Sequence, residues 1–358
     1  MSDATNNQAA GGPVPDPQPS TLNPQPHLSP GRRAWLRFRR NRPAVISSWF
    51  LALLLAFVLG WPLVLAVAGH TGTAGKAFAE QHDPDALSND QFKPPGATHW
   101  FGTDVHGRDV FSRTLYGAQV SLMVGAVGTL VSLIIGVAWG AVAGYLGGRW
   151  DSVMMRFVDV LYSLPSIIFV IVLITTMEGL LKHWLDHLAM QSQGPLAGPF
   201  RHWLTTQVWP EVARLARLLF LFVGLGAVSW LTMARIVRGQ VLALRHRAFV
   251  EASRVLGAGH RHILFRHILP NVLGVVIVYL ALTIPAIILY ESFLSYLGLG
   301  IQPPMSSWGS LIADGAGQIN TIRVYWWLLV FPGAMLVSTL LALNYLGDGF
   351  RDAWDVRG

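Results

Sequence analysis

The chain has 358 residues, of which 52% are hydrophobic and 13% are charged, whereas about a quarter of the residues in an ordinary soluble domain are charged. This composition excludes a water-soluble protein and indicates a membrane protein. The net charge of +7 comes mainly from arginines clustered beside apolar stretches, a pattern that favours membrane topology over nucleic-acid binding. The absence of cysteine excludes a disulfide framework and cysteine metal sites.

The first 30 residues form a polar tail with seven prolines and almost no large apolar side chain. Such a segment cannot offset the entropy of ordering, so residues 1–30 are predicted to be a disordered cytoplasmic tail. Residues 31–43 follow as a basic juxtamembrane segment in which arginines are interleaved with Trp35, Leu36 and Phe38. We expect this segment to anchor on anionic lipid rather than to bind nucleic acid.

Six charge-free apolar runs can cross a bilayer, which takes about 20 residues of helix. They predict an all-α polytopic membrane protein with six transmembrane helices. The predicted helices cover residues 44–69, 119–148, 153–177, 213–235, 267–290 and 324–347, with an external loop at 70–118 and a cytoplasmic tail at 348–358. Of the 26 lysines and arginines, 17 fall in the 68 residues on one side of these helices. Because positive residues mark the inner side, both termini are predicted to be cytoplasmic.

The first external loop contains a glycine-punctuated stretch between His99 and Arg113. Two carboxylates lie close to two guanidinium groups in this stretch, so the sequence predicts a turn held by its own salt bridges. The residues of this external motif are Gly102, Thr103, Asp104, Gly107, Arg108 and Asp109.

The second external segment, residues 178–213, contains Trp184, Trp203 and Trp209. An apolar rhythm over residues 182–190 predicts a helix that lies on the outer membrane surface. Two histidines four residues apart in this rhythm have no third ligand, so no metal site is predicted.

Small residues and prolines punctuate the predicted spans. Glycines at every fourth residue of the second span, at positions 136, 140 and 144, predict a face on which another helix packs closely. The prolines that interrupt spans, as happens where helices bend around a pathway, are Pro165, Pro285 and Pro332.

Two carboxylates stand at the ends of predicted spans, Asp159 at the inner end of the third and Glu291 at the outer end of the fifth. Near a helix end, water or a neighbouring arginine can solvate a carboxylate, so a structural role is the default interpretation. A buried carboxylate would instead imply function. Together with Pro165, these two residues are the candidates for lining a pathway.

A polar stretch between the fourth and fifth spans predicts a short helix with a glycine stop. Such a helix outside the bilayer can insert into a partner. Its candidate contact residues are Phe249, Glu251, Ala252, Ser253, Arg254, Leu256 and Gly257.

This stretch resembles a loop of a known family. Glu251-Ala252-Ser253, then three residues, Gly257, eleven residues and Leu269-Pro270 resembles the EAA loop of ABC-transporter inner-membrane permeases, whose helix docks in a cleft of the ATP-hydrolysing subunit. Ser253 stands where that family usually has a third alanine, a departure that keeps the residue small.

With the external motif and the segment 297–304, the chain looks like the dipeptide/oligopeptide permease family, in its C-type subunit. The resemblance implies a type I ABC importer permease fold, in which residues 119–347 form the ABC type-1 transmembrane domain. It also implies a multi-pass protein of the bacterial inner membrane.

The partners follow from the same resemblance: a homologous second permease subunit, two ATPase subunits, an external solute-binding protein and the lipid bilayer. None of the three lysines stands in a phosphate-binding G-x-x-x-x-G-K-[ST] loop. We therefore expect no catalytic site, no metal and no directly bound cofactor, with ATP and Mg²⁺ held by the partner ATPase subunits.

The transported substrate is predicted to be a di- or oligopeptide, and nickel or a peptide-like antibiotic is an alternative. From another class, an ion-coupled secondary transporter should carry several intramembrane ionisable residues and internal repeats, neither of which is clear here. A membrane-embedded enzyme would need a polar constellation inside the spans, and none is visible.

Overall fold

Helices account for nearly all of the regular structure in this computed structural model, which describes residues 30–191, 197–203, 206–207, 209–303, 305–319 and 323–354. The predicted tail at 1–30 falls almost wholly outside the described residues. Among the described residues the one β pairing is an isolated bridge between Thr103 and Asp109. The helical elements are α1 (Pro30–Arg40), α2 (Arg42–Ala68), α3 (Gly72–Gln81), α4 (Val110–Leu146), α5 (Gly148–Ser163), α6 (Ser166–Gln191), α7 (Ala197–Trp203), α8 (Trp209–Leu244), α9 (Ala248–Val255), α10 (His260–His262), the π-helical turn η2 (Ile263–Ile268), α11 (Leu269–Tyr296), α12 (Trp308–Gly317) and α13 (Trp327–Trp354).

Six helical segments in the described part of the chain are long and apolar enough to cross a membrane, which confirms the predicted number. Their bounds are Arg42–Ala68, Val110–Leu146, Ser166–His187, Leu215–Leu244, His260–Tyr296 and Trp327–Trp354. Several extend past the predicted ends. The second was predicted to begin at residue 119, yet α4 begins at Val110 and includes Arg113, and α8 continues past the predicted end at Arg235 to Leu244.

The third span differs most from its prediction. The chain breaks at Leu164 and Pro165, so the predicted helix 153–177 is divided between α5 and α6. Pro165 therefore separates two helices, whereas Pro285 and Pro332 lie inside α11 and α13 as expected. A proline disfavours helical geometry in the preceding residue, and Leu164 is extended with ψ 137°.

Two further chain segments differ from what the sequence suggested. Residues 182–190 do not form a separate surface helix, because α6 runs without a break through them to Gln191. The expected tail at 348–358 begins as helix, since α13 continues to Trp354 before the described residues end.

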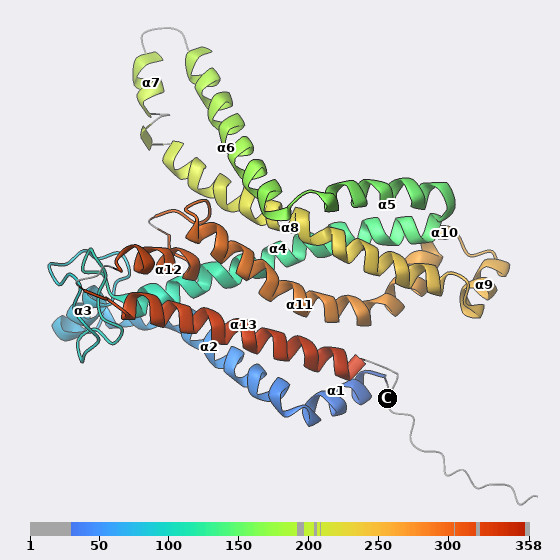
Figure 1. Cartoon of the computed structure of the whole chain (residues 1–358), viewed down its shortest axis with the longest axis horizontal. Helices are drawn as coiled ribbons and strands as arrows, with labels where there is room; N and C mark the ends of the chain where they lie inside the picture. Colours follow the sequence, from blue (N-terminus) through green and yellow to red (C-terminus); the bar gives the residue numbers. More distant parts are fainter. Residues whose placement is uncertain are drawn as a thin grey trace, which may run out of the picture.

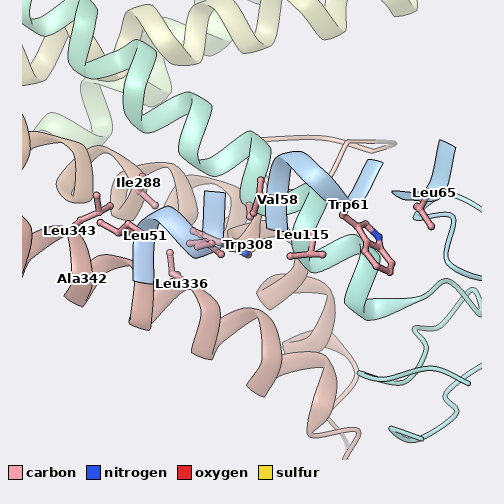
Figure 2. Packing of buried hydrophobic residues seen from close by; sticks show 12 residues of the cluster. Leu51, Val58, Trp61, Leu65, Leu115, Ile288, Trp308, Leu336, Ala342 and Leu343 are labelled. Atoms are coloured by element: carbon pink, nitrogen blue, oxygen red, sulfur yellow. The ribbon is translucent and has the colours of Figure 1, made fainter. Parts of the chain in front are cut away.

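The core lies around α4, which packs against α2, α8 and α11. One cluster of buried apolar side chains joins α2, α4, α11, α12 and α13. Figure 2 shows Trp308 of α12 among side chains of these helices, including Leu51 and Leu336. Trp308 is fully buried, and its indole nitrogen donates to the carbonyl of Thr114 at 3.1 Å.

A glycine stripe on α4 allows close contact with α8, as the sequence predicts. A Cβ atom added to Gly140 would lie 2.4 Å from the carbonyl oxygen of Ala234, and one added to Gly136 would lie 2.6 Å from the Cβ of Met233. Gly144 meets Arg238 and Val241 in the same way. The contacts advance together along both helices, so α4 and α8 run parallel.

The two ends of the bundle carry different elements (Figure 1). The described ends of the chain, at α1 and α13, lie at the same end as α9 and α10. At the opposite end lie α3, α12 and the loop that precedes α4, while α6 and the start of α8 project away from the other helices.

Replacing Gly140 by alanine should destabilise the fold by about 1–3 kcal/mol, because the new methyl group must push α8 away from α4. Gly60→Ala in α2 is a matched control, since nothing lies within 4 Å of its added Cβ. The thermal unfolding temperature of each purified variant in detergent measures the effect. Equal unfolding temperatures for Gly140→Ala and Gly60→Ala would contradict the close packing.

Candidate functional site

The predicted short helix with a glycine stop is present as α9, which begins after Arg247 and ends at Val255. Its end is a Schellman motif: the amide of Ala258 donates to the carbonyl of Ser253, and the amide of Gly257 donates to that of Arg254, both at 3.0 Å. Gly257 has φ +82°, a conformation that glycine adopts without the penalty of a Cβ atom. The glycine is thus required by backbone geometry.

One residue of α9 fixes the helix to the bundle. Val250 is fully buried in a cluster with Val241 of α8, Ile263 and Ile268 of η2, and Val272 of α11. Burying one such side chain contributes about 1.5–3 kcal/mol. The helix α9 is therefore packed directly against the ends of α8 and α11.

The other face of α9 is open to solvent. Glu251, Ala252 and Arg254 are exposed, and the side chain of Ser253 is half-buried beside His267. Large apolar groups are exposed on and beside this helix, with Phe249 at 41%, Val255 at 88% and Leu256 at 86% of their full accessible area, and Phe265 of η2 at 67%. An exposed apolar cluster rimmed by charges is typical of a protein interaction site.

The sequence reasoning missed Val255 and Phe265 as members of this surface. Both are apolar residues in a segment that is otherwise polar, which is the signal that could have identified them. The structure places Phe249, Glu251, Ala252, Arg254, Leu256 and Gly257 at one exposed end of the molecule, as expected for a contact element.

The external motif is organised around Asp104. One of its oxygens accepts from the backbone amides of His106 and Arg108 at 2.8 and 2.9 Å, and the other accepts from the side chains of Arg108 at 2.8 Å and Arg113 at 2.6 Å. Burial by itself raises the pKa of Asp104, but Arg113, Arg108 and the backbone donors outweigh it and hold this pKa below its usual value. The predicted salt-bridged turn is present.

Asp109, the second carboxylate of the motif, has partners that the sequence reasoning did not identify. It caps α4 by accepting from the amide of Ser112 at 3.0 Å, and its oxygens lie 3.0 Å from His99 Nδ1 and 3.2 Å from His82 Nδ1. Burial raises the pKa of Asp109, yet contacts with His82, Ser112 and His99 bring it below its ordinary value. No local spacing links His82 to this loop, so only the fold reveals the pair.

The remaining motif residues shape the backbone. Gly102 and Gly107 have φ +76° and +74°, and a Cβ on either would collide with the carbonyl oxygens of Lys93 or Ser88. Thr103 is fully buried; its hydroxyl donates to the Asp90 carbonyl and accepts from the Lys93 amide at 2.8 Å. The motif is thus a closely packed, hydrogen-bonded turn at the start of α4.

Of the three candidate pathway residues, Asp159 and Pro165 lie in and just after α5, whereas Glu291 lies in α11. Asp159 accepts a hydrogen bond from Arg235 at 2.7 Å and is exposed, in agreement with the expectation that an arginine solvates it. Pro165 is exposed in the turn between α5 and α6.

The structure contradicts the expectation that water or an arginine solvates Glu291, because this residue is 0% exposed. Its oxygens accept instead from the hydroxyls of Ser295 at 2.6 Å and Ser121 at 3.1 Å, with Ser292 at 3.4 Å. The Ser121 hydroxyl in turn accepts from the Trp308 amide at 3.2 Å. The contacts of Glu291 therefore link α11, α4 and α12. The carboxylate can be buried because the serine hydroxyls supply hydrogen-bond donors without adding charge.

Among the described residues, no group of three or more histidines, cysteines or carboxylates is arranged to hold a metal ion. The features that the structure does provide are an exposed helix anchored to the bundle, a hydrogen-bonded turn before α4 and six helices that are long and apolar enough to cross a membrane.

Comparisons with known proteins agree with these features. Residues 136–357 match the family described as the binding-protein-dependent transport system inner membrane component, and residues 29–95 match the N-terminal TM domain of oligopeptide transport permease C.

Individual relatives cover nearly the whole chain. It is 40% identical to the oligopeptide transport system permease protein OppC of Haemophilus influenzae, across 91% of this chain and 89% of the relative. It is 42% identical to OppC of Escherichia coli, across 91% and 92%, and 40% identical to the dipeptide transport system permease protein DppC of Bacillus subtilis, across 92% and 87%. The chain therefore belongs to the binding-protein-dependent transport system inner membrane component family, as a multi-pass permease of the bacterial inner membrane.

Proposed function

We propose that this chain is the permease subunit of an ATP-driven importer of di- and oligopeptides, and that α9 is the element through which ATP hydrolysis drives it. The observation that carries the proposal is the exposed face of α9 on a helix anchored by the buried Val250. The names of the relatives, which are oligopeptide and dipeptide permeases, support the substrate class.

The proposed assembly contains a second, homologous permease, two ATPase subunits with ATP and Mg²⁺, and an external solute-binding protein. An ATPase subunit would receive Phe249, Val255 and Leu256 in an apolar cleft, with Glu251 and Arg254 at its rim. Because Val250 packs on α8 and α11, closure of the ATPase pair would pull these helices and switch the bundle between outward-open and inward-open states.

The proposed topology has α9 and both termini in the cytoplasm. Two observations support it: the excess of arginine on one side of the six spans, and the position of α1, α9 and the end of α13 at the same end of the molecule (Figure 1). The external motif and α12 would then face the solute-binding protein.

A second candidate, an ion-coupled secondary transporter, draws support from Glu291. An ionisable residue inside a span is a common mark of an ion pathway. Its complete burial among three serine hydroxyls favours a structural role instead, because an ion could reach it only if α4 and α11 separated.

Cysteine labelling tests the topology, since the chain has no native cysteine. In intact cells that express the chain alone, Leu87→Cys should react with an impermeant thiol reagent and Val255→Cys should not. Both positions are highly exposed, at 74% and 88%, so both should react once the cells are permeabilised. Labelling of Val255→Cys but not Leu87→Cys in intact cells would reverse the proposed orientation.

Reconstitution tests substrate and coupling together. In vesicles, the complete complex with its binding protein should concentrate labelled peptides, but not nickel or a sugar. This uptake should require ATP on the side of the membrane where the ATPase subunits lie. Glu251→Lys should abolish most of this uptake. Gly257→Val should lower it about five- to thirtyfold, because a left-handed conformation costs a β-branched residue about 1–2 kcal/mol.

Gly259→Val is the matched control for the glycine variant, because Gly259 has φ −67° and nothing within 4 Å of an added Cβ. It should transport like the unmodified chain. Normal uptake by Glu251→Lys and Gly257→Val at equal protein level would refute the role of α9. Transport of nickel or sugar without peptide would refute the substrate, and concentrative uptake by this chain alone on an ion gradient would favour the second candidate.

A further inference from the structure

A cavity of about 390 Å³ opens among the spans, between the end of α5, the start of α6 and the central parts of α8 and α11. This volume falls in the range of small-ligand sites. None of the described residues that line it is charged. Leu164 and Ser166, the neighbours of Pro165, form part of its wall, so the break between α5 and α6 shapes the cavity.

Hydroxyl groups gather in the wall of this cavity. Six of them make no hydrogen bond to any residue that the structure describes, and they belong to Tyr162, Ser166, Ser229, Thr232, Tyr279 and Tyr290. A seventh hydroxyl in the wall, that of Thr283, bonds to the Tyr279 carbonyl at 2.7 Å, as Thr175 outside the cavity bonds to the Ile171 carbonyl at 2.9 Å. All six residues are exposed or half-buried, so their hydroxyls can hydrogen-bond to a polar molecule that enters the cavity.

Charged residues lie on either side of the cavity along α8, and not in the cavity itself. At one end Arg235 pairs with Asp159 and lies 4.2 Å over the ring of Tyr162. Toward the other end of α8, Arg217 donates to Glu178 of α6 at 2.7 Å, beside a second cavity of about 300 Å³. The order along α8 is therefore charge, neutral hydroxyls, charge.

We propose that this cavity is a peptide-binding site within the permease, in which the hydroxyls hydrogen-bond to the amide groups of the passing backbone. The inference rests on the proposed function and names the residues that handle its substrate. A hydroxyl both donates and accepts, so it can bind either the N–H or the C=O of a peptide unit. Because no fixed charge faces the cavity, acidic and basic side chains of a transported peptide meet the same environment. The cavity would therefore recognise the backbone amide groups, which all peptides share.

A thiol-protection experiment tests occupancy directly. In the assembled, otherwise cysteine-free complex, Thr232→Cys should react with a methanethiosulfonate reagent. Trialanine should slow that reaction about tenfold at about ten times its half-protection concentration. Trilysine and triglutamate should protect to a similar extent. Thr175→Cys, an exposed position on α6 outside the cavity, should react equally fast with and without peptide.

Isosteric variants test the hydroxyls. Thr232→Val and Tyr290→Phe keep the shape of the cavity and should each lower the maximal rate of peptide uptake about two- to tenfold, by a similar factor for all three peptides. Thr175→Val is the matched control and should transport normally.

The outcomes separate this inference from the proposed function. If the unmodified complex imports trialanine but Thr232→Cys is not protected and neither isosteric variant slows transport, peptides pass elsewhere and the inference is wrong. Protection by phospholipid but not by trialanine would mark the cavity as an acyl-chain site and also overturn it. Failure of the unmodified complex to import any peptide would refute the proposed function itself.

Discussion

The structure depends on one constraint: a charge inside or beside an apolar span must have a partner, because hydrocarbon offers none. Four arginines in the spans meet carboxylates, and the buried carboxylate Glu291 meets serine hydroxyls. These contacts tie together segments that are distant in the chain and leave the cavity between them neutral. The ion pairs concerned are Arg113–Asp104, Arg217–Glu178, Arg235–Asp159 and Arg238–Asp151.

The same constraint divides the molecule into parts with different freedom to move. The α4–α8 contact allows no gap, since an added Cβ at Gly140 would strike a backbone oxygen, and Glu291 links α4 to α11 and α12. By contrast, α6 projects from the bundle and joins α5 through the turn at Pro165. In the alternating-access mechanism that we propose, the movement would occur where the cavity lies, between the closely packed α4, α8 and α11 and the segment α5–α6. The proposed role of α9 is to drive this movement through α8 and α11.

Local patterns predicted much of this from sequence. Apolar runs predicted the six spans, the stop at Gly257 predicted the end of α9, and neighbouring charges predicted the turn around Asp104. What failed depended on distant partners. The fourth span was ended at Arg235, whose partner Asp159 lies on another helix, and the burial of Glu291 follows from Ser121 of α4, far from it in sequence. The cavity arises only where α5, α6, α8 and α11 meet, so no single sequence pattern could reveal it.

The central claim is that α9 makes the contact through which an ATPase subunit drives this permease. Site-specific photo-crosslinking from Val255, the most exposed apolar residue of α9, measures that contact most directly. In the assembled complex, a photoreactive side chain at this position should crosslink to an ATPase subunit, and the yield should change between the nucleotide-free and ATP-bound states. Crosslinks confined to lipid or to this chain, in a complex that still transports with ATP, would contradict the account.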